Sequence, residues 1–174
     1  MAYELILLEM AEGIATISVN RPKALNALNP QVMEEIGAAL KEIAGNPEVR
    51  VAILTGTGDK AFVAGADIGT MAKQTPLEAK RFSAAGQEVL LAMEEADIVL
   101  FVADARSGLH PEDPAIVEKL RRTAKPVMVV INKVDGAERN VHVSEFFQLG
   151  GEKFYPVSAA HGFGFGELLA ELTR

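Results

Sequence analysis

Four short stretches of the sequence carry residues suited to holding a ligand. Asn-Lys-Val-Asp at 132–135 follows the apolar run 127–131, and Ser-Ala-Ala at 158–160 follows a second short apolar stretch. A glycine-rich loop at 56–69 follows another apolar run, and residues 20–28 follow the first hairpin. In α/β proteins, ligands bind at the edge of the sheet where parallel strands end. We therefore expect two binding half-sites at one sheet edge rather than a catalytic cluster.

Composition argues against several classes of function. The chain has no Cys, which excludes a disulfide framework, a thiolate metal site and a cysteine nucleophile. His110, His142 and His161 are scattered without ligand spacing, so we expect no metal site and no resident cofactor. The formal net charge is −7 and Lys and Arg do not cluster, which argues against a nucleic-acid partner. Residues 1–8 lack the basic start of a signal peptide, and no stretch approaches the ~20 apolar residues of a membrane span. We expect a cytoplasmic protein.

The elements that position the ligand-binding stretches follow from periodicity. Residues 3–9 and 14–19 predict a β-hairpin, and Asn29 followed by Pro30 predicts a helix start. Four further strands are predicted at 49–55, 96–104, 127–131 and 154–157, alternating with helices at 76–93, 114–123, 143–149 and 166–172. In the run 96–104, apolar residues fall on both faces of the predicted strand. This pattern predicts a strand buried on both sides.

This order predicts an α/β fold. We expect the hairpin to be followed by βαβ units in a single, mostly parallel sheet of about six strands with flanking helices. No linker, repeat or low-complexity tract interrupts the chain, so we expect one domain over residues 1–174. The two halves, 1–87 and 88–174, join inside the helix predicted at 76–93.

The first half, residues 1–87, resembles the N-terminal half of the crotonase (enoyl-CoA hydratase/isomerase) family. The resemblance rests on residues 20–28, Asn-Arg-Pro-Lys-Ala-Leu-Asn-Ala-Leu, and on residues 60–68, Lys-Ala-Phe-Val-Ala-Gly-Ala-Asp-Ile. In that family these two loops bind coenzyme A. The resemblance implies that the walls of such a site are Lys23, Ala24, Leu25 and Ala27 on one side and Ala64, Ala66, Asp67 and Ile68 on the other.

The same resemblance gives a role to the backbone of Ala66. Its N–H would be one of two donors of an oxyanion hole, which stabilises charge as it develops on a thioester oxygen. The family's second donor lies in a Gly-Gly-Gly-x-Glu segment, and its catalytic glutamates follow. No such segment occurs in this sequence, so we expect no catalytic residue here and little catalysis.

The second half, residues 88–174, resembles the C-terminal half of a G domain of the EngA/Der type. The matching stretches are 94–106, 108–113, 125–126, 132–135 and 156–162. The resemblance implies a guanine site made of Asn132, Lys133, Asp135, Ser158, Ala159 and Ala160. Asp135 would accept the N1–H and amine of the base, Asn132 would contact its major-groove edge, and the Lys133 stem would pack along the ring. Ala159 or Ala160 would offer a backbone N–H to the guanine carbonyl.

The phosphate-binding part of such a site is missing from the sequence. A GTPase needs Gly-x-x-x-x-Gly-Lys-Ser/Thr, and the glycines and Lys of 56–60 are wrongly spaced. We therefore expect guanine nucleotides to bind weakly, without hydrolysis.

The halves could form one G-domain-like or Rossmann-like sheet, with the strand at 96–104 beside the strand at 49–55. Right-handed crossovers would then place most helices on one face, leaving the helix at 166–172 alone on the other. An under-covered apolar face predicts self-association, most simply as a homodimer.

Three functional hypotheses follow. The first is an engineered chimera, a fold-recombination scaffold that is not an enzyme. The second is a weak guanine-nucleotide-binding module. The third is a crotonase-like protein with residual acyl-CoA binding.

Overall fold

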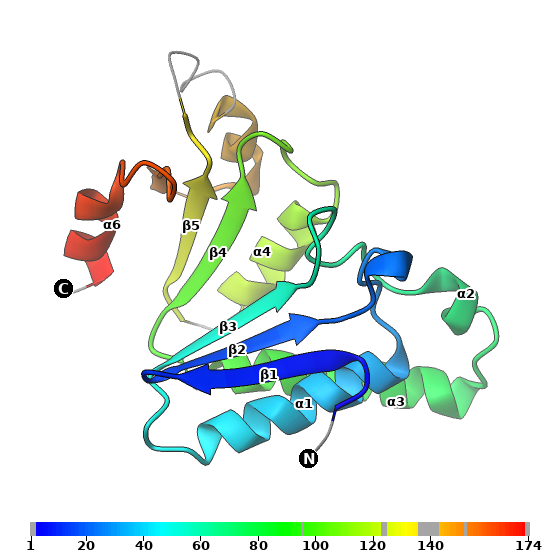
Figure 1. The fold of residues 1–174 in the computed structure, drawn as a ribbon. Coiled ribbons are helices and arrows are strands. Elements are labelled where there is room, and N and C mark those ends of the chain that lie inside the picture. Colours follow the sequence, from blue (N-terminus) through cyan, green and yellow to red (C-terminus); the bar gives the residue numbers. More distant parts are fainter. Residues whose placement is uncertain (1–2, 95, 123–124, 136–142, 152, 173–174) are drawn as a thin grey trace. The chain divides into compact units, whose positions relative to one another are not determined.

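The computed structural model describes residues 3–94, 96–122, 125–135, 143–151 and 153–172 (Figure 1). The chain divides into two compact units, Met1–Ala92 and Met93–Arg174. Each unit has its own three-stranded sheet and is described by itself below. The single domain expected from the sequence stays a prediction.

The sheet of the first unit begins with the predicted hairpin. Strands β1 (Ile6–Ala11) and β2 (Ile14–Val19) pair antiparallel around a turn at Glu12 and Gly13, both with positive φ. Strand β3 (Val51–Gly56) then pairs parallel to β2, with Ile17 opposite Leu54. The order is β1-β2-β3, so β2 is the central strand of this sheet.

Helix α1 (Pro30–Ala44) covers one face of this sheet. It starts as predicted, because the Asn29 side chain caps it by accepting a hydrogen bond from Val32 N at 2.8 Å and Pro30 fills the first turn. The buried residues are Val32, Met33, Ile36, Ala39 and Ile43 from the helix and Ile6, Ala15, Ile17 and Val19 from the sheet. This packing forms the core of the first unit.

Three further helices complete the first unit. A 3-10 turn η1 (Pro22–Ala24) lies in the loop after β2, and a short helix α2 (Ile68–Met71) begins at Asp67, whose side chain caps Thr70 N. The long helix α3 (Pro76–Glu94) contains the boundary between the units, which falls between Ala92 and Met93. Thr75 and Glu78 form a reciprocal capping box at its start.

The second unit is a parallel sheet with helices on both faces. Strands β4 (Val99–Asp104), β5 (Val127–Asn132) and β6 (Phe154–Pro156) pair in the order β4-β5-β6. Helix α4 (Asp113–Arg121) and the 3-10 helix η2 (Ser144–Leu149) pack through Val117, Phe146 and Leu149 on a cluster that includes Val129 and Ile131. Helix α6 (Phe165–Leu172) packs through Leu168 on the opposite face, beside Met128 and Val130.

The predicted α/β class and the mostly parallel pairing are confirmed, and one feature is corrected. The strands form two three-stranded sheets, not one sheet of about six strands. Strands β3 and β4 are edge strands of these sheets, so β4 is not buried on both sides as the sequence predicted. Val51 is 50% exposed and Val102 is 58% exposed. Among the described residues, no helix has the length and apolar character needed to cross a membrane.

Candidate functional site

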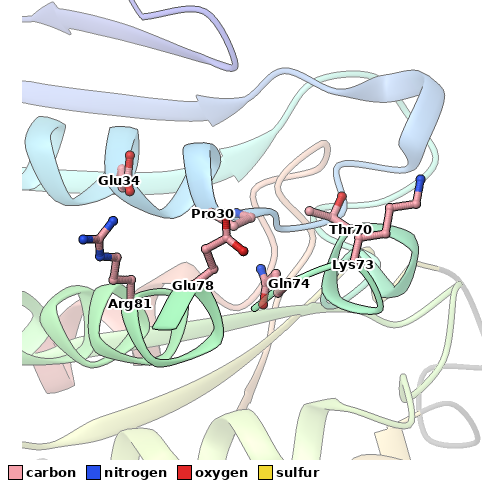
Figure 2. A pocket seen from close by; sticks show the side chains of 7 residues that line it. All are labelled: Pro30, Glu34, Thr70, Lys73, Gln74, Glu78 and Arg81. Carbon is pink, nitrogen blue, oxygen red and sulfur yellow. The ribbon is translucent and has the colours of Figure 1, made fainter. Parts of the chain in front are cut away.

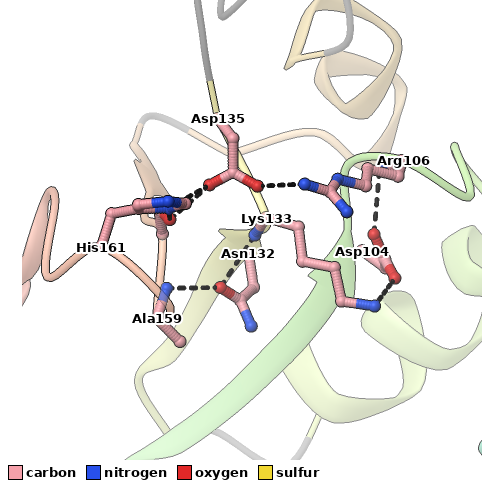
Figure 3. A network of polar contacts seen from close by, with 8 residues as sticks. Asp104, Arg106, Asn132, Lys133, Asp135, Ala159 and His161 are labelled. Carbon is pink, nitrogen blue, oxygen red and sulfur yellow. Dashed lines mark hydrogen bonds and ion pairs between the residues drawn. The ribbon is translucent and has the colours of Figure 1, made fainter.

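The residues predicted to contact guanine lie together at the carboxyl ends of β5 and β6 (Figure 3). Asn132 is the last residue of β5, and Lys133 and Asp135 follow it. Ser158 lies beyond the end of β6 and is buried. Because β5 and β6 run parallel, their ends bring the two predicted stretches to one edge of the sheet.

The side chain of Asn132 joins these two stretches. Its Oδ1 accepts hydrogen bonds from Lys133 N at 2.8 Å and from Ala159 N at 3.0 Å. Lys133 has φ 63°, a left-handed conformation that the first of these bonds helps to hold. Within the described residues, the Nδ2 donor of Asn132 has no hydrogen-bond partner, so it remains available to a ligand.

Asp135 is the most heavily bonded carboxylate of this site. Its Oδ1 accepts a short hydrogen bond from the Ser158 hydroxyl and lies 3.2 Å from His161 Nδ1. Its Oδ2 lies 2.6 Å from Arg106 Nη2. The hydrogen bond from Ser158 is the largest of several effects that hold the pKa of Asp135 below its usual value, with His161 and Arg106 adding to it. The carboxylate is therefore ionised and positioned to accept donors.

Lys133 is tied to the neighbouring strand. Its Nζ lies 2.6 Å from Oδ2 of Asp104, the last residue of β4, and Asp104 Oδ1 accepts from Arg106 N at 2.9 Å. Burial raises the pKa of Asp104, but the hydrogen bonds from Lys133 and from the backbone outweigh it, so the pKa lies below its usual value. The side-chain stem of Lys133 is thereby drawn across the edge of the sheet.

The two alternatives for a backbone donor to the base separate in the structure. The N–H of Ala159 already donates to Asn132 Oδ1. The N–H of Ala160 has no acceptor in the part of the chain that the structure describes, and Ala160 is exposed. Ala160 is therefore the donor free to meet a ligand.

In the first unit, the two loops that resemble the crotonase family lie against each other. Leu28 N donates to Gly65 O and Asp67 N donates to Leu28 O, both at 2.8 Å, so Leu28 and Ala66 form a parallel bridge. In such a bridge the residues flanking Ala66 make the bonds, which leaves its own N–H directed away from Leu28. That N–H has no acceptor among the described residues.

Asn26 fastens these loops from inside. It is 1% exposed, its Oδ1 accepts from Arg21 N, and its Nδ2 donates to Thr57 O and Ala61 O, each at 2.9 Å. Gly56 allows this approach, because a Cβ there would lie 2.2 Å from Phe62 O and 2.5 Å from Asn26 Nδ2. The loop positions therefore depend on residues that we did not assign to the site.

A second tie joins the loops at Asp67. Arg21 Nη2 lies 3.0 Å from Asp67 Oδ2, and Arg21 Nη1 donates to Ala27 O. The hydrogen bond from Arg21, followed by that from Thr70 N, holds the pKa of Asp67 below its usual value. The other predicted residues are exposed or half-buried along these two loops: Lys23, Ala24, Leu25, Ala27, Ala64 and Ile68.

A pocket of about 420 Å³ lies elsewhere in the first unit, against α1, α2 and α3 (Figure 2). Its lining includes Glu34, Lys73, Glu78 and Arg81, with Gln74 Nε2 buried and unpaired. Lys73 and Arg81 stand at opposite ends of the pocket, so its charges do not converge on one point. Among the described residues no cluster of His, Cys, Asp and Glu could hold a metal ion, and His142 lies outside them. The absence of a metal site stays a prediction.

Sequence reasoning missed four residues that build these sites: Arg21, Asn26, Asp104 and Arg106. Asp104 carries a signal that could have found it, because it ends a strand parallel to β5 at the edge that holds Asn132. Asn26 and Arg21 lie within the stretch 20–28, but Asn26 acts through the distant backbone of Thr57 and Ala61, and Arg21 acts through the distant side chain of Asp67. Such contacts leave no periodicity in the sequence.

Comparison with known proteins matches both parts of the chain. Residues 9–104 match the Enoyl-CoA hydratase/isomerase family, and residues 86–174 match the Elongation factor Tu GTP binding domain family. The chain is a chimera of two α/β segments. It belongs to the Enoyl-CoA hydratase/isomerase family along its first part and to the Elongation factor Tu GTP binding domain family along its second.

Individual relatives repeat this division. The chain is 55% identical over 86 residues to GTPase Der of Syntrophobacter fumaroxidans, covering 49% of this chain and 19% of the relative. It is 48% identical over 94 residues to crotonyl-CoA hydratase of Syntrophomonas wolfei, covering 54% of this chain and 36% of the relative. The chain thus spans about a fifth of the first relative and about a third of the second.

Solved structures share the fold of the first family. Enoyl-CoA hydratase from Bacillus anthracis matches at 23% identity with a TM-score of 0.55, over 75% of this chain and 48% of that one. An enoyl-CoA hydratase/carnithine racemase from Magnetospirillum magneticum matches at 18% identity with a TM-score of 0.60, over 99% of this chain and 74% of that one.

These matches overturn one expectation. The sequence led us to expect that the chain is not an enzyme, because motifs of both families are missing. The family match at 9–104 and the crotonyl-CoA hydratase relative contradict that expectation, since both join the chain to hydratases.

Proposed function

We propose that the second unit binds the base of a guanine nucleotide. The observation that carries this proposal is the hydrogen bond from Ala159 N to Asn132 Oδ1, which fixes the amide of Asn132 and leaves its Nδ2 without a partner among the described residues (Figure 3). Hydrogen bonds to Asn132 Oδ1 already hold the backbone of this edge, so binding would need little ordering of the backbone.

The polar groups of this edge match those of guanine. Guanine offers N–H donors on one side and the acceptors O6 and N7 on the other. The ionised Asp135 would accept the donors, the Nδ2 of Asn132 would donate to N7, and the N–H of Ala160 would donate to O6. Adenine carries an amino group at the position of O6, so it would place a donor against the N–H of Ala160. This mismatch is the source of the proposed selectivity.

Thermal unfolding with GDP, and with ADP as the control ligand, tests the proposal. A ligand that binds only the folded state raises the midpoint even when binding is weak. We expect a rise with GDP and none with ADP. Asp135→Ala should abolish the rise, whereas Glu118→Ala, which removes an exposed carboxylate from α4, should keep it. Equal effects of GDP and ADP would contradict the proposal.

A second function is supported in the first unit by the free N–H of Ala66. We propose that this group donates to the carbonyl oxygen of an acyl-CoA thioester bound between the two loops. Ala66→Pro removes the N–H and Ala66→Gly keeps it. Binding or hydration of an enoyl-CoA should therefore survive only the Gly variant, with unfolding curves showing that both variants are folded. Loss in both variants would argue against the N–H as the donor.

We also propose that the chain arose by engineered recombination. The two family matches overlap only over residues 86–104, and the boundary between the compact units, Ala92 to Met93, falls within this overlap and inside α3. A genome that encodes both segments in one reading frame would contradict an engineered origin.

We propose, finally, that the chain forms a homodimer through the sheet of the second unit. Leu100 and Val102 of β4 lie on the same face of the sheet as Met128 and Val130 of β5. Helix α6 packs on Met128 and Val130, whereas Leu100 and Val102 are 41% and 58% exposed. A second copy that covers them would bury apolar surface.

A further inference from the structure

We infer that Arg106 holds the carboxylate of Asp135, the proposed base-binding group, and must leave it when guanine binds. This inference rests on the proposed guanine site of the second unit. Arg106 Nη2 lies 2.6 Å from Asp135 Oδ2, while Asp135 Oδ1 is taken by Ser158 and His161. Each oxygen of the carboxylate therefore already has a donor, as Figure 3 shows.

The backbone at Arg106 is fixed, but its side chain is not enclosed. Ala105, which precedes it, is buried and donates from its N–H to Asn132 O at 2.8 Å. The N–H of Arg106 itself donates to Asp104 Oδ1 at 2.9 Å. The Arg106 side chain is 68% exposed, against 19% for Asp135. The guanidinium is thus held within reach of the carboxylate while remaining free to swing into solvent.

The partners of Asp135 differ in how easily they can be displaced. Ser158 is buried and would keep its hydrogen bond to Oδ1 when a ligand binds. Arg106 is exposed and is the single donor on Oδ2 among the described residues. A guanidinium and the N1–H and amine edge of guanine both present adjacent N–H donors, and both suit a carboxylate. Arg106 and guanine therefore compete for Oδ2.

The strength of this competition is modest. An ion pair with one exposed partner contributes little, and salt weakens it further. Removing Arg106 should therefore tighten base binding by about two- to fivefold. Salt should also tighten binding to the unaltered chain, because it weakens the ion pair that the ligand displaces. Guanosine is the right probe, since it has no phosphate whose own interactions would fall with salt.

The alternative is that the guanidinium stays and packs on the bound base. Arginine stacks on aromatic faces, and this would make Arg106 a contributor to affinity. The two roles predict opposite changes in the affinity for guanine when Arg106 is removed. Removal of Arg106 would weaken binding if it packs on the base, and would strengthen binding if it competes for Oδ2.

Guanosine titrations followed by backbone amide NMR separate these outcomes, with adenosine as the control. We would compare the unaltered chain, Arg106→Ala and Arg122→Ala at about 0.05 M and about 0.5 M salt. Arg122→Ala is the matched control, because it removes an exposed Arg paired with Glu118 on α4. We expect Arg106→Ala alone to bind guanosine more tightly than the unaltered chain. Higher salt should raise the affinity of the unaltered chain and of Arg122→Ala, and should not raise that of Arg106→Ala.

Each result decides between the claims. Selective guanosine binding that is unchanged or weaker in Arg106→Ala would overturn the competition and leave the guanine site standing. Binding of guanosine by none of the three chains would overturn the guanine site, and the competition with it. Detectable binding by Arg106→Ala alone would support both.

Discussion

The side-chain oxygen of Asn132 accepts the backbone N–H of Ala159 at 3.0 Å, and this bond joins the end of β5 to the loop after β6. The same oxygen also accepts a hydrogen bond from Lys133 N. One acceptor therefore serves two backbone donors, of which Lys133 is adjacent to Asn132 in sequence and Ala159 is distant. The bond separates the structural role of the Asn132 amide, carried by its oxygen, from the binding role that we propose for its nitrogen.

Two substitutions of Asn132 test this separation. Asn132→Ala leaves the N–H groups of Lys133 and Ala159 without their acceptor, and we expect a loss of stability of about 1–3 kcal/mol together with loss of GDP binding. Asn132→Asp keeps an oxygen acceptor and loses the nitrogen donor, so stability should be largely retained while GDP binding falls. Urea unfolding and GDP titration measure both properties. Full GDP binding by Asn132→Asp would show that the nitrogen is not used.

Asn26 provides a prediction for the first unit. Asn26→Ala removes three hydrogen bonds in a buried position and leaves backbone groups of Arg21, Thr57 and Ala61 unpaired. We expect a destabilisation of about 1–3 kcal/mol or more, measured by urea unfolding. Gln31→Ala is the control, because the two hydrogen bonds of the Gln31 side chain are exposed. Removing that side chain should change stability little. A small effect of Asn26→Ala would mean that the loops are held elsewhere.

Stability at acid pH should depend on Asp67. Its pKa in the folded chain lies below the ordinary value of 3.8, first because of the hydrogen bond from Arg21. The unfolded chain therefore binds a proton here at higher pH than the folded chain, so the contribution to stability is present above about pH 4 and is lost as pH falls through the folded pKa.

Unfolding measured from neutral to acid pH checks this dependence. Asp67→Asn should be less stable than the unaltered chain at neutral pH, and the difference should shrink as pH falls through the window below 3.8. Asp59→Asn, at an exposed position of the same unit, is the control. A difference that stays constant with pH would contradict the role of the Asp67 charge.

Self-association should depend on Val102. Val102→Lys places a charge on the exposed part of the second sheet, and burying that charge in a dimer would be unfavourable. Light scattering over a range of concentrations should show a mass that rises with concentration for the unaltered chain and stays monomeric for Val102→Lys. Glu118→Lys, on helix α4, should behave like the unaltered chain. A monomeric mass for the unaltered chain at every concentration would contradict the homodimer.

Local signals in the sequence predicted most of the elements. Asn29 and Pro30 predicted the start of α1, and the apolar run before Asn132 predicted β5 within a residue. These signals succeed because caps and strand burial are read from neighbouring residues. The short helix α2 was not predicted, because its single turn is set by the cap from Asp67 and carries no periodicity.

Features that depend on how strands combine were less accessible. The run 96–104 has the pattern of a strand buried on both sides, yet β4 is an edge strand with Val102 exposed. The sequence pattern of a strand shows how hydrophobic its residues are. It does not show which other elements are available to cover them. In the site, the roles of Asn132, Asp135 and Ser158 were implied by the resemblance to a G domain, and the strand ends predicted only that their stretches lie at one edge. The ion pair of Arg106 with Asp135 joins residues 29 apart and could be found only in three dimensions.

The most direct test of the guanine site is a titration of the isotope-labelled chain with GDP and with ADP, followed through the backbone amides of Lys133 and Ala160. We expect GDP to shift both signals in a saturable way, because Lys133 flanks the proposed base position and the N–H of Ala160 is its proposed donor to O6. ADP should leave both unchanged at the same concentrations. Equal shifts with both nucleotides, or shifts confined to other parts of the chain, would contradict a guanine-specific site in the second unit.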